Sequence, residues 1–383
     1  MNKSICFAQK SALFYKDTCV TIQTTIRYLG GLPMNTTLNY GLIGCGSFGN
    51  EHMKAMLMIP GVKVTALCDI HIERCYEMNE RYGLDAKCYE NYNDMLAAQK
   101  FDIVVVAAVD KAHAGATVAA LRAGSHVLCE KPMSLFLEDC KEMIRTADET
   151  GKLLMVGQVC RFTPGFIKAK EIVDAGVIGE LYFIESEYAH DYVNLPGTDG
   201  WRTDPDREPI IGGACHAIDL VRWIAGDPIE TMAYTNHKVL THWPVNDTTV
   251  SIMKFPNEVI GKVFASIGCK RDYTMRTVIY GTKGTIIVDN TTPYLTLMLE
   301  NCADNAHFAN GFFGTGSERS IRHQIDVSLN NHNVAAEHQA LRESVLEGKP
   351  LLMTGREGAK TVAVCRAVVE AANSGKAIQV DYE

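Results

Sequence analysis

The stretch LNYGLIGCGSFG at residues 38–49 decides the fold of this chain. Its first half is an apolar run typical of a buried strand, and its second half has the glycine spacing G-x-G-x-x-G. A helix is predicted at residues 51–59, and a second apolar strand at residues 62–67 leads to Asp69. Strand, glycine turn, helix, strand and acid in this order are typical of a domain that binds a dinucleotide.

The glycines of the motif each have a physical task. Gly44 permits the tight turn, Gly46 allows backbone N–H groups to approach a pyrophosphate, and Gly49 allows the helix to pack closely on the strand. The phosphates are expected at the helix N-terminus, next to Ser47 and Phe48. A glycine turn that only serves packing is the alternative, but the two flanking strands and the acid favour a cofactor site.

Asp69 indicates which dinucleotide is bound. It lies 20 residues after Gly49, where a carboxylate accepts hydrogen bonds from the adenosine ribose. Its negative charge would repel the 2′-phosphate of NADP. The sequence therefore predicts NAD as the cofactor, in preference to NADP.

More strand–helix units follow the motif. Strands are predicted at residues 101–109 and 125–129, with a helix at residues 112–123 between them. Alternating strands and helices with right-handed crossovers give a doubly wound parallel sheet, the Rossmann fold. We place this NAD-binding domain at residues 37–157.

The end of the strand at residues 125–129 is a second candidate site, because it runs directly into Glu130-Lys131-Pro132. Ligands of doubly wound sheets bind beyond the carboxyl ends of the strands, which places Glu130 and Lys131 at the cofactor. His113, at the start of the preceding helix, is predicted as a further cofactor contact. Lys131 is suited to stabilise a developing negative charge or to carry a proton.

The second half predicts an α+β domain at residues 158–383 with a large, mostly antiparallel sheet. After a helix at residues 164–175, strand-like stretches recur without helices between most of them. They lie at residues 181–188, 229–240, 248–255, 259–266, 277–280 and 285–288. Residues 301–330 lack periodicity and are predicted as a long loop, one that could cover the active site.

The composition excludes several classes of partner. The 383 residues carry a net charge of −8 without a block of like charge, which disfavours nucleic-acid and membrane-surface binding. The longest apolar runs are too short to span a bilayer. Thirteen scattered cysteines without a C-x-x-C pair argue against a zinc ribbon and fit a reducing compartment. We expect a soluble, cytoplasmic protein.

Residues 1–36 do not match the pattern that follows and are predicted as an N-terminal extension. They carry four basic residues against Asp17 alone, with no apolar segment of signal-peptide length. A mitochondrial transit peptide is one alternative, although Asp17 argues against it. We favour a disordered arm, or a true start at Met34.

Short motifs along nearly the whole chain carry a family resemblance. They are GLIGCG at 41–46 with His52, Glu130-Lys131-Pro132, RFTP at 161–164, GVIGE at 176–180, Trp201-Arg202, Gly212-Gly213, HAIDL at 216–220 and Trp223. Together they resemble the glucose–fructose oxidoreductase/inositol dehydrogenase/MocA (Gfo/Idh/MocA) family over about residues 38–380. The combination is specific for the family and much less so for the substrate.

The resemblance implies an NAD-dependent oxidoreductase with Lys131 and His216 as catalytic residues. Hydride would move between nicotinamide and a ring hydroxyl carbon of a sugar, glycoside or cyclitol, with C3 of a pyranoside as one candidate position. His216 would accept the hydroxyl proton, and Lys131 would stabilise the alkoxide. The family also implies homo-oligomers that form through the C-terminal sheet.

One residue departs from the family pattern. Many members carry an aspartate four residues before the histidine, where this chain has Gly212. Either another acid serves, with Asp191 and Asp219 as candidates, or Lys131 and His216 act without a third member. Asp219 lies three residues after His216 on the same helix face, so it could orient the imidazole or serve packing.

Sugar-like substrates need several polar groups and an aromatic surface. Substrate contacts are therefore predicted on segments expected near the cofactor: Arg161, Tyr188, Asp191, Trp201, Arg202, Asp219 and His332. The histidines lack the spacing of metal ligands, so no metal is predicted. Two rival functions keep the cofactor: a glycosidase or lyase that recycles NAD in place, and a catalytically silent NAD-binding sensor.

Overall fold

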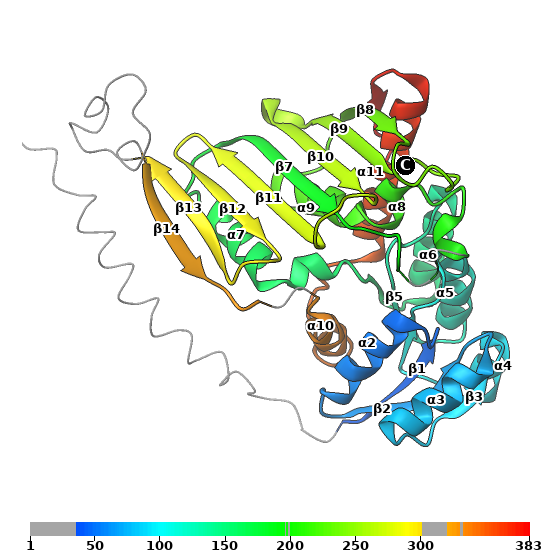
Figure 1. Cartoon of the computed structure of the whole chain (residues 1–383). Helices are drawn as coiled ribbons and strands as arrows, with labels where there is room; N and C mark the ends of the chain where they lie inside the picture. Colours follow the sequence, from blue (N-terminus) through cyan, green and yellow to red (C-terminus); the bar gives the residue numbers. More distant parts are fainter. Residues whose placement is uncertain (1–35, 196, 198–199, 301–319, 330–331) are drawn as a thin grey trace, which may run out of the picture. The chain divides into compact units, whose positions relative to one another are not determined.

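The computed structural model describes residues 36–195, 197, 200–300, 320–329 and 332–383. Leu38–Glu383 forms one compact unit, with a strand–helix part and a second, larger sheet (Figure 1). The predicted N-terminal extension lies outside the described residues except for Thr36.

The first part is built on a parallel sheet, here called the nucleotide sheet. Its six described strands pair in the order β3-β2-β1-β4-β5-β6, and each pair is parallel. They are β1 (Leu38–Ile43), β2 (Val62–Cys68), β3 (Lys87–Tyr89), β4 (Ile103–Val106), β5 (His126–Cys129) and β6 (Leu154–Val156). The predicted Rossmann sheet is confirmed.

Helices connect the strands of the nucleotide sheet. The helices described here are α2 (Ser47–Leu57), α3 (Ile72–Tyr82), α4 (Tyr92–Ala98), α5 (His113–Arg122) and α6 (Leu137–Thr150), with the short η1 (Asp110–Ala112) before α5. The predicted start of the first helix at residue 51 is wrong by four residues, because Gly46 is the N-cap and the glycine motif itself forms the first turn. α2 buries His52, Met53 and Met56, whose spacing of three and four residues places them on one face.

The second part is built on a larger sheet, here called the C-terminal sheet. Its nine described strands pair in the order β14-β13-β12-β11-β7-β10-β9-β8-β15, and only β7 and β10 run parallel. They are β7 (Leu181–Ala189), β8 (Glu230–Asn236), β9 (Thr248–Lys254), β10 (Ile260–Ser266), β11 (Thr274–Gly281), β12 (Gly284–Asp289), β13 (Tyr294–Glu300), β14 (Ser320–Asp326) and β15 (Ile378–Gln379). The predicted mostly antiparallel sheet is confirmed.

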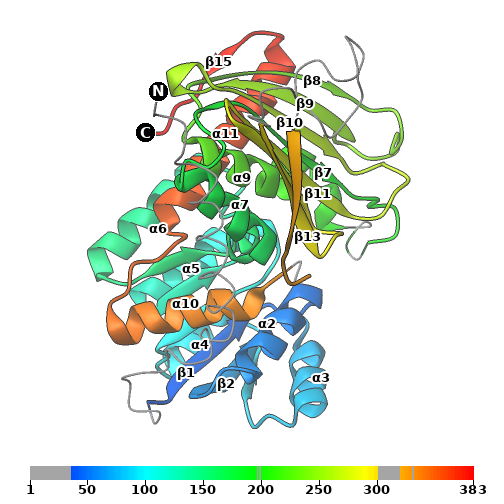
Figure 2. The ribbon, with the colours of Figure 1, turned by 90° about the vertical axis from the view of Figure 1, so that its left-hand side faces the viewer.

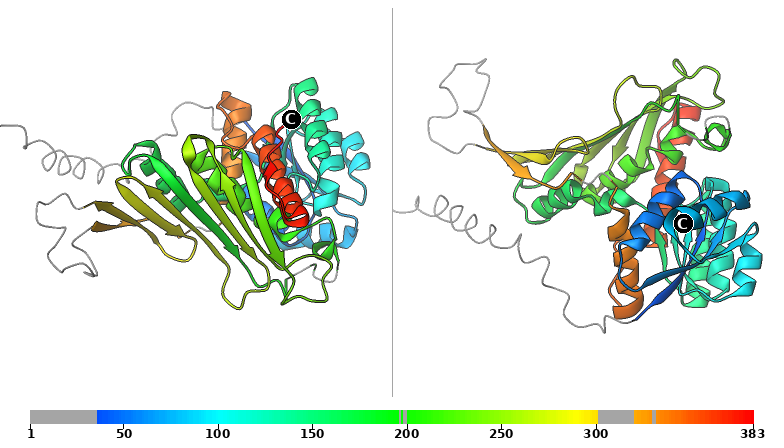
Figure 3. Two further views of the ribbon diagram at one scale, coloured as in Figure 1. Left: turned by 90° about the horizontal axis from the view of Figure 1, so that it is seen from above. Right: turned by 60° about the horizontal axis from the view of Figure 1, so that its bottom comes forward.

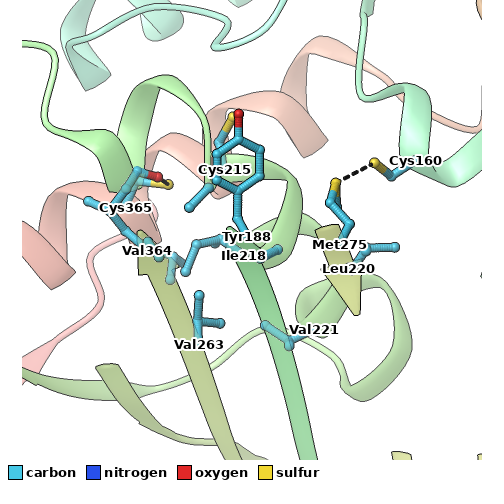
Figure 4. Close-up of a cluster of buried hydrophobic side chains, with 14 of the residues drawn as sticks. Cys160, Tyr188, Cys215, Ile218, Leu220, Val221, Val263, Met275, Val364 and Cys365 are labelled. Atoms are coloured by element: carbon cyan, nitrogen blue, oxygen red, sulfur yellow. Dashed lines mark hydrogen bonds between the residues drawn. The ribbon is translucent and has the colours of Figure 1, made fainter. Parts of the chain in front are cut away.

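Helices cover one face of the C-terminal sheet (Figure 3). They are α7 (Pro164–Asp174), α8 (Pro209–Gly212), α9 (Cys215–Ala225) and α11 (Gly355–Ser374); the short η2 (Val159–Phe162), η3 (Trp201–Thr203) and η4 (Pro256–Glu258) lie in connections. The core between sheet and helices is apolar, and in Figure 4 Ile218 and Val221 from α9 lie near Val263 of β10 and Val364 of α11. This core fixes α9, whose first turn carries His216.

The prediction of a loop over residues 301–330 is wrong for its last part, since Ser320–Asp326 is the edge strand β14. β14 pairs with β13, another strand that was not predicted. Most side chains of β14 are polar or exposed, so its backbone pairing with β13 holds it there, and a hydrophobic pattern could not reveal it. Residues 301–319 lie outside the described part of the chain.

The last segment of the chain returns to the nucleotide sheet. α10 (Val334–Glu347) lies beside α2 (Figure 2), and Met353 and Val362 belong to the apolar core of the first part. The core of the first part contains residues from both sides of residue 157, so this position does not separate the two cores. The domain boundary at residue 157 stays a prediction.

Among the described residues, no helix is both long enough and apolar enough to cross a membrane.

Candidate active site

A cavity of about 760 Å³, here called the cleft, lies at the carboxyl ends of β1, β2, β4 and β5. Its other wall is the loop that carries Trp201, Arg202 and Arg207. Eight of the nine predicted cofactor contacts line it: Gly44, Gly46, Ser47, Phe48, Asp69, His113, Glu130 and Lys131. Gly49 does not line the cleft and lies behind the loop.

The glycine loop has the shape that a pyrophosphate needs. Gly44 has a φ of +98°, and a Cβ there would lie 2.4 Å from the carbonyl oxygen of Ala107. A Cβ on Gly49 would lie 2.1 Å from the carbonyl oxygen of Gly44, so the loop and α2 pack too closely for a side chain. At Gly46, by contrast, a Cβ would meet nothing within 4 Å, which leaves an open cradle at the N-terminus of α2.

Asp69 is fixed at the end of β2 by backbone groups. Its Oδ2 accepts a hydrogen bond from the N–H of Cys45 (2.8 Å), and its Oδ1 accepts one from the N–H of His71 (2.9 Å). The Arg74 guanidinium lies 3.5 Å from Oδ1, and its side chain is half exposed at 50%. The Asp69 carboxylate is thus held in one orientation at the end of β2, where a ribose is expected, and the Arg74 guanidinium lies beside it.

Lys131 follows β5, and the residue before it anchors this turn. Glu130 Oε2 accepts a hydrogen bond from the Lys131 N–H (3.1 Å), and Oε1 lies 2.9 Å from Nε2 of His52 on α2. His52 Nδ1 in turn lies 2.9 Å from Nε2 of His338 on α10. Burial opposes the charged form of Glu130, but His52 and Lys131 outweigh it and lower the pKa of this carboxyl.

Glu337 is a second buried acid near this turn. Its side chain is fully buried, and neither carboxyl oxygen has a hydrogen-bond partner among the described residues. Burial, and then the charge of Glu130, raises its pKa well above the ordinary value, which favours the neutral form of Glu337.

His113 supports the same turn from the start of α5. Its Nδ1 donates to the carbonyl oxygen of Pro132 (2.8 Å) and its Nε2 to that of Ala108 (3.1 Å), which requires a doubly protonated ring. Burial opposes this charge, but Cys129, Asp110 and the Pro132 carbonyl outweigh it and raise the pKa of His113 to about 10.

His216 is a neutral, buried histidine in the first turn of α9. Only 3% of it is exposed, and its Nδ1 lies 3.0 Å from Oε1 of Gln158. Since an amide oxygen can only accept, Nδ1 carries the proton and Nε2 is left as the basic atom. Burial, followed by the charges of Lys131 and His332, lowers the pKa of His216 well below its usual value.

Gln158 was missed by the sequence analysis. It lies two residues after β6, at the same edge of the nucleotide sheet as Lys131, and this position was the available signal.

Arg207 occupies the space next to Gly212. A Cβ on Gly212 would lie 2.3 Å from Cζ of Arg207, whose Nη2 donates to the Gly212 carbonyl oxygen (3.0 Å). Arg207 is itself buried and pairs with Asp110 through its Nε. At the position where the family resemblance implies an aspartate, this chain therefore has a glycine beside a buried arginine–aspartate pair.

Each of the two candidate acids is paired with a basic side chain. Asp219 is fully buried and accepts two hydrogen bonds from Arg161, both at 2.8 Å. Asp191 pairs with Lys270 at 3.0 Å. Of the two alternatives for Asp219, this arrangement favours the packing role, because Arg161 and not the imidazole binds it. The same pair argues for a structural role of Arg161 and Asp219 in place of substrate binding.

The remaining predicted substrate contacts lie at different depths. Trp201 and Arg202 line the cleft, with the Arg202 guanidinium 4.3 Å from the Trp201 ring centroid. His332 is exposed, and its ring lies 6.3 Å from that of His216. Tyr188 is buried, and its hydroxyl lies 2.7 Å from that of Tyr192, which indicates a supporting role.

No group of three or more His, Cys, Asp or Glu side chains in the described residues has an arrangement that could hold a metal ion.

Two family models match the chain. The NAD-binding Rossmann fold of an oxidoreductase family covers residues 38–158, and the GFO/IDH/MocA C-terminal domain covers residues 166–287. Inositol 2-dehydrogenase 2 of Saccharopolyspora erythraea is 30% identical over 255 residues, which are 65% of this chain and 73% of that protein. The chain belongs to the GFO/IDH/MocA oxidoreductase family.

Other GFO/IDH/MocA proteins are similar along more of the chain. Myo-inositol 2-dehydrogenase of Thermotoga maritima is 25% identical over 331 residues, 84% of this chain and 92% of that protein. A solved levoglucosan dehydrogenase in complex with NADH and levoglucosan shares the fold, with a TM-score of 0.79, 21% identity and coverage of 91% of this chain and 100% of that one. The prediction of an NAD(P)-dependent dehydrogenase acting on CH–OH groups is confirmed at the level of this family.

Proposed function

We propose that this GFO/IDH/MocA oxidoreductase transfers hydride between NAD and a ring hydroxyl carbon of a sugar, glycoside or cyclitol. The observation that carries the proposal is the neutral His216, whose Nδ1 contacts Gln158. Gln158 and Lys131 both lie at the carboxyl-end edge of the nucleotide sheet. The names of the relatives, inositol dehydrogenases and a levoglucosan dehydrogenase, support the substrate class. C3 of a pyranoside ring is the position that we propose for oxidation.

Different residues of the chain bind the cofactor, accept the proton and orient the substrate. The glycine loop and Asp69 would hold NAD, which supplies the hydride acceptor when bound. Nε2 of His216 accepts the proton of the substrate hydroxyl, because Nδ1 already donates to Gln158. The Lys131 ammonium stabilises the alkoxide as it forms. Trp201 and Arg202 offer a flat surface and a cation that orient the substrate.

We also propose NAD in preference to NADP. The Asp69 carboxylate would accept hydrogen bonds from the ribose hydroxyls and repel a 2′-phosphate. Arg74, which is partly exposed beside it, reduces this repulsion without removing it.

Two further proposals concern the state of the protein. The cysteines of the described residues are free thiols, which fits the reducing cytoplasm. Figure 3 shows helices on one face of the C-terminal sheet. Tyr234, Val250 and Ile252 are exposed and alternate along β8 and β9 with buried residues, which fits a homo-oligomer that buries the other face.

The test follows NADH absorbance with NAD and a panel of monosaccharides, cyclitols and glycosides. We expect NADH formation and a two-dalton loss from one substrate class. Lys131→Ala and His216→Ala should each lower kcat by at least about 100-fold while NAD still binds. Unchanged turnover in both folded variants would refute the mechanism, and glycoside cleavage without NADH would favour the NAD-recycling glycosidase.

A further inference from the structure

Three cysteines lie beside the glycine loop and form a cluster, here called the thiol cluster. Cys45, between the first two glycines of the loop, has its Sγ 3.6 Å from the Sγ of Cys75 in the first turn of α3. Cys88 lies on β3, and burial, followed by its interaction with Cys75, raises the pKa of its thiol to about 11. Cys45 and Cys75 are buried at 3% and 0% exposure, whereas Cys88 is partly exposed.

The two inner thiols are not equivalent. The hydrogen bond from Cys45 lowers the pKa of Cys75, and the same contact raises the pKa of Cys45. Cys75 also lies in the first turn of α3, where the helix dipole favours a thiolate. Cys75 is therefore the better nucleophile, and Cys45 lies within contact distance to resolve an oxidised Cys75.

We propose that Cys45 and Cys75 are a dithiol modification site that hydrogen peroxide oxidises to a disulfide. The Cys75 thiolate attacks the peroxide, so an S–O bond forms, the O–O bond breaks, and the leaving oxygen takes a proton to become water. Cys45 then attacks the Cys75 sulfenic acid, so the S–S bond forms and the S–O bond breaks, releasing a second water with the Cys45 proton. Two thiols lose two electrons, and the peroxide gains them.

This disulfide would change the dinucleotide site. The sulfurs must approach from 3.6 Å to about 2.0 Å, and the two cysteine side chains, the glycine loop and α3 share this movement. The loop cannot move freely, because the Cys45 N–H bonds to Asp69, the residue that faces the ribose. Oxidation therefore displaces the glycine loop relative to Asp69 and weakens NAD binding.

The coupling must act in both directions. If the disulfide weakens NAD binding tenfold, bound NAD opposes disulfide formation by the same factor. For a two-electron couple, that factor corresponds to a shift of about 30 mV in reduction potential. NAD should therefore protect the thiol cluster against peroxide.

The experiment treats the reduced full-length chain with hydrogen peroxide, with and without NAD, and maps the peptides without reduction. We expect a Cys45–Cys75 linkage, at least a tenfold rise in the Kd of NAD, slower oxidation when NAD is present, and reversal by dithiothreitol. Cys6, Cys19 and Cys302 lie outside the described residues, so the peptide map is decisive where a total thiol count is not.

Two variants serve as controls. Cys75→Ser should bind NAD like the reduced protein and keep that affinity after peroxide, whereas Cys140→Ser, which removes a buried thiol on α6, should respond like the native chain. A Cys75–Cys88 linkage, oxidation without a disulfide, or a Cys45–Cys75 disulfide with unchanged NAD affinity would each overturn the proposal. If Cys75→Ser does not fold, the map of the native chain still decides.

Discussion

Replacing Gln158 tests the proposed role of His216 most directly. Gln158 is buried at 1% exposure and does not line the cleft, so Gln158→Leu should leave the Kd of NAD unchanged. The variant leaves the Nδ1–H of His216 without its acceptor at 3.0 Å, which costs about 1–3 kcal/mol for a buried donor. The cost is greatest when His216 becomes an imidazolium, that is, in the transition state.

The expected effect follows from this free energy. At about 1.4 kcal/mol per factor of ten, kcat/KM should fall by about 5- to 150-fold. Stopped-flow measurement of NADH formation across pH 5 to 10 gives the rate and its pH dependence. The acid limb should move to lower pH, because His216 has lost a group that stabilises its charged form.

Gln158→Glu is the matched variant. A carboxylate in nearly the same position stabilises the imidazolium, so the pKa of His216 should rise and the acid limb should move to higher pH. A folded Gln158→Leu protein with native kcat/KM and a native pH profile, or two variants that shift the limb in the same direction, would refute the reasoning.

Three further predictions follow from the same contacts. Asp69→Asn removes the charge but keeps an acceptor, so the ratio of the NADP and NAD dissociation constants should fall at least about tenfold in fluorescence titrations; an unchanged ratio would contradict this. Gly212→Asp forces Arg207 from its pair with Asp110 and should lower the free energy of unfolding by about 3 kcal/mol in chemical denaturation. The double variant Gly212→Asp with Arg207→Gly should recover part of this loss. The buried His216 and His338 have pKa values well below the usual one, so the unfolded chain binds protons first as the pH falls below about 6.5. Stability should decline below that pH, and a melting temperature that stays flat down to pH 5 would argue against neutral histidines. Above that pH stability should decline as well, because the pKa of His113 is raised to about 10 in the folded chain.

Parts of the site could be predicted because their chemistry is encoded locally. The glycine spacing, the acid after the second strand and the lysine after β5 each depend on a few consecutive residues, and they line one cleft. The contacts of Gln158 and Arg207 could not be predicted, because their partners lie 58 and 97 residues away in sequence. A contact of this kind depends on how the elements pack, which composition and periodicity do not record.

The roles of Arg161 and Asp219 are hard to predict for a related reason. Arg161 and Asp219 are polar residues near a catalytic histidine, and their types suit sugar binding as well as they suit a buried ion pair. Only the fold shows that their charges neutralise each other at 2.8 Å. The edge strand β14 was missed for a similar reason, since its pairing with β13 is a backbone contact that leaves little trace in the side chains.

The docking of α10 on α2 has a consequence for the order of synthesis. His52 and its partner His338 are separated by 286 residues, so a ribosome adding about 5–20 residues per second needs about 15 to 60 seconds between them. During that interval the nascent N-terminal half lacks α10 and exposes the side of α2 that carries His52. The last segment of the chain therefore completes the fold of the first part. Chains truncated before α10 should be retained by chaperones even though every residue of the glycine loop is present.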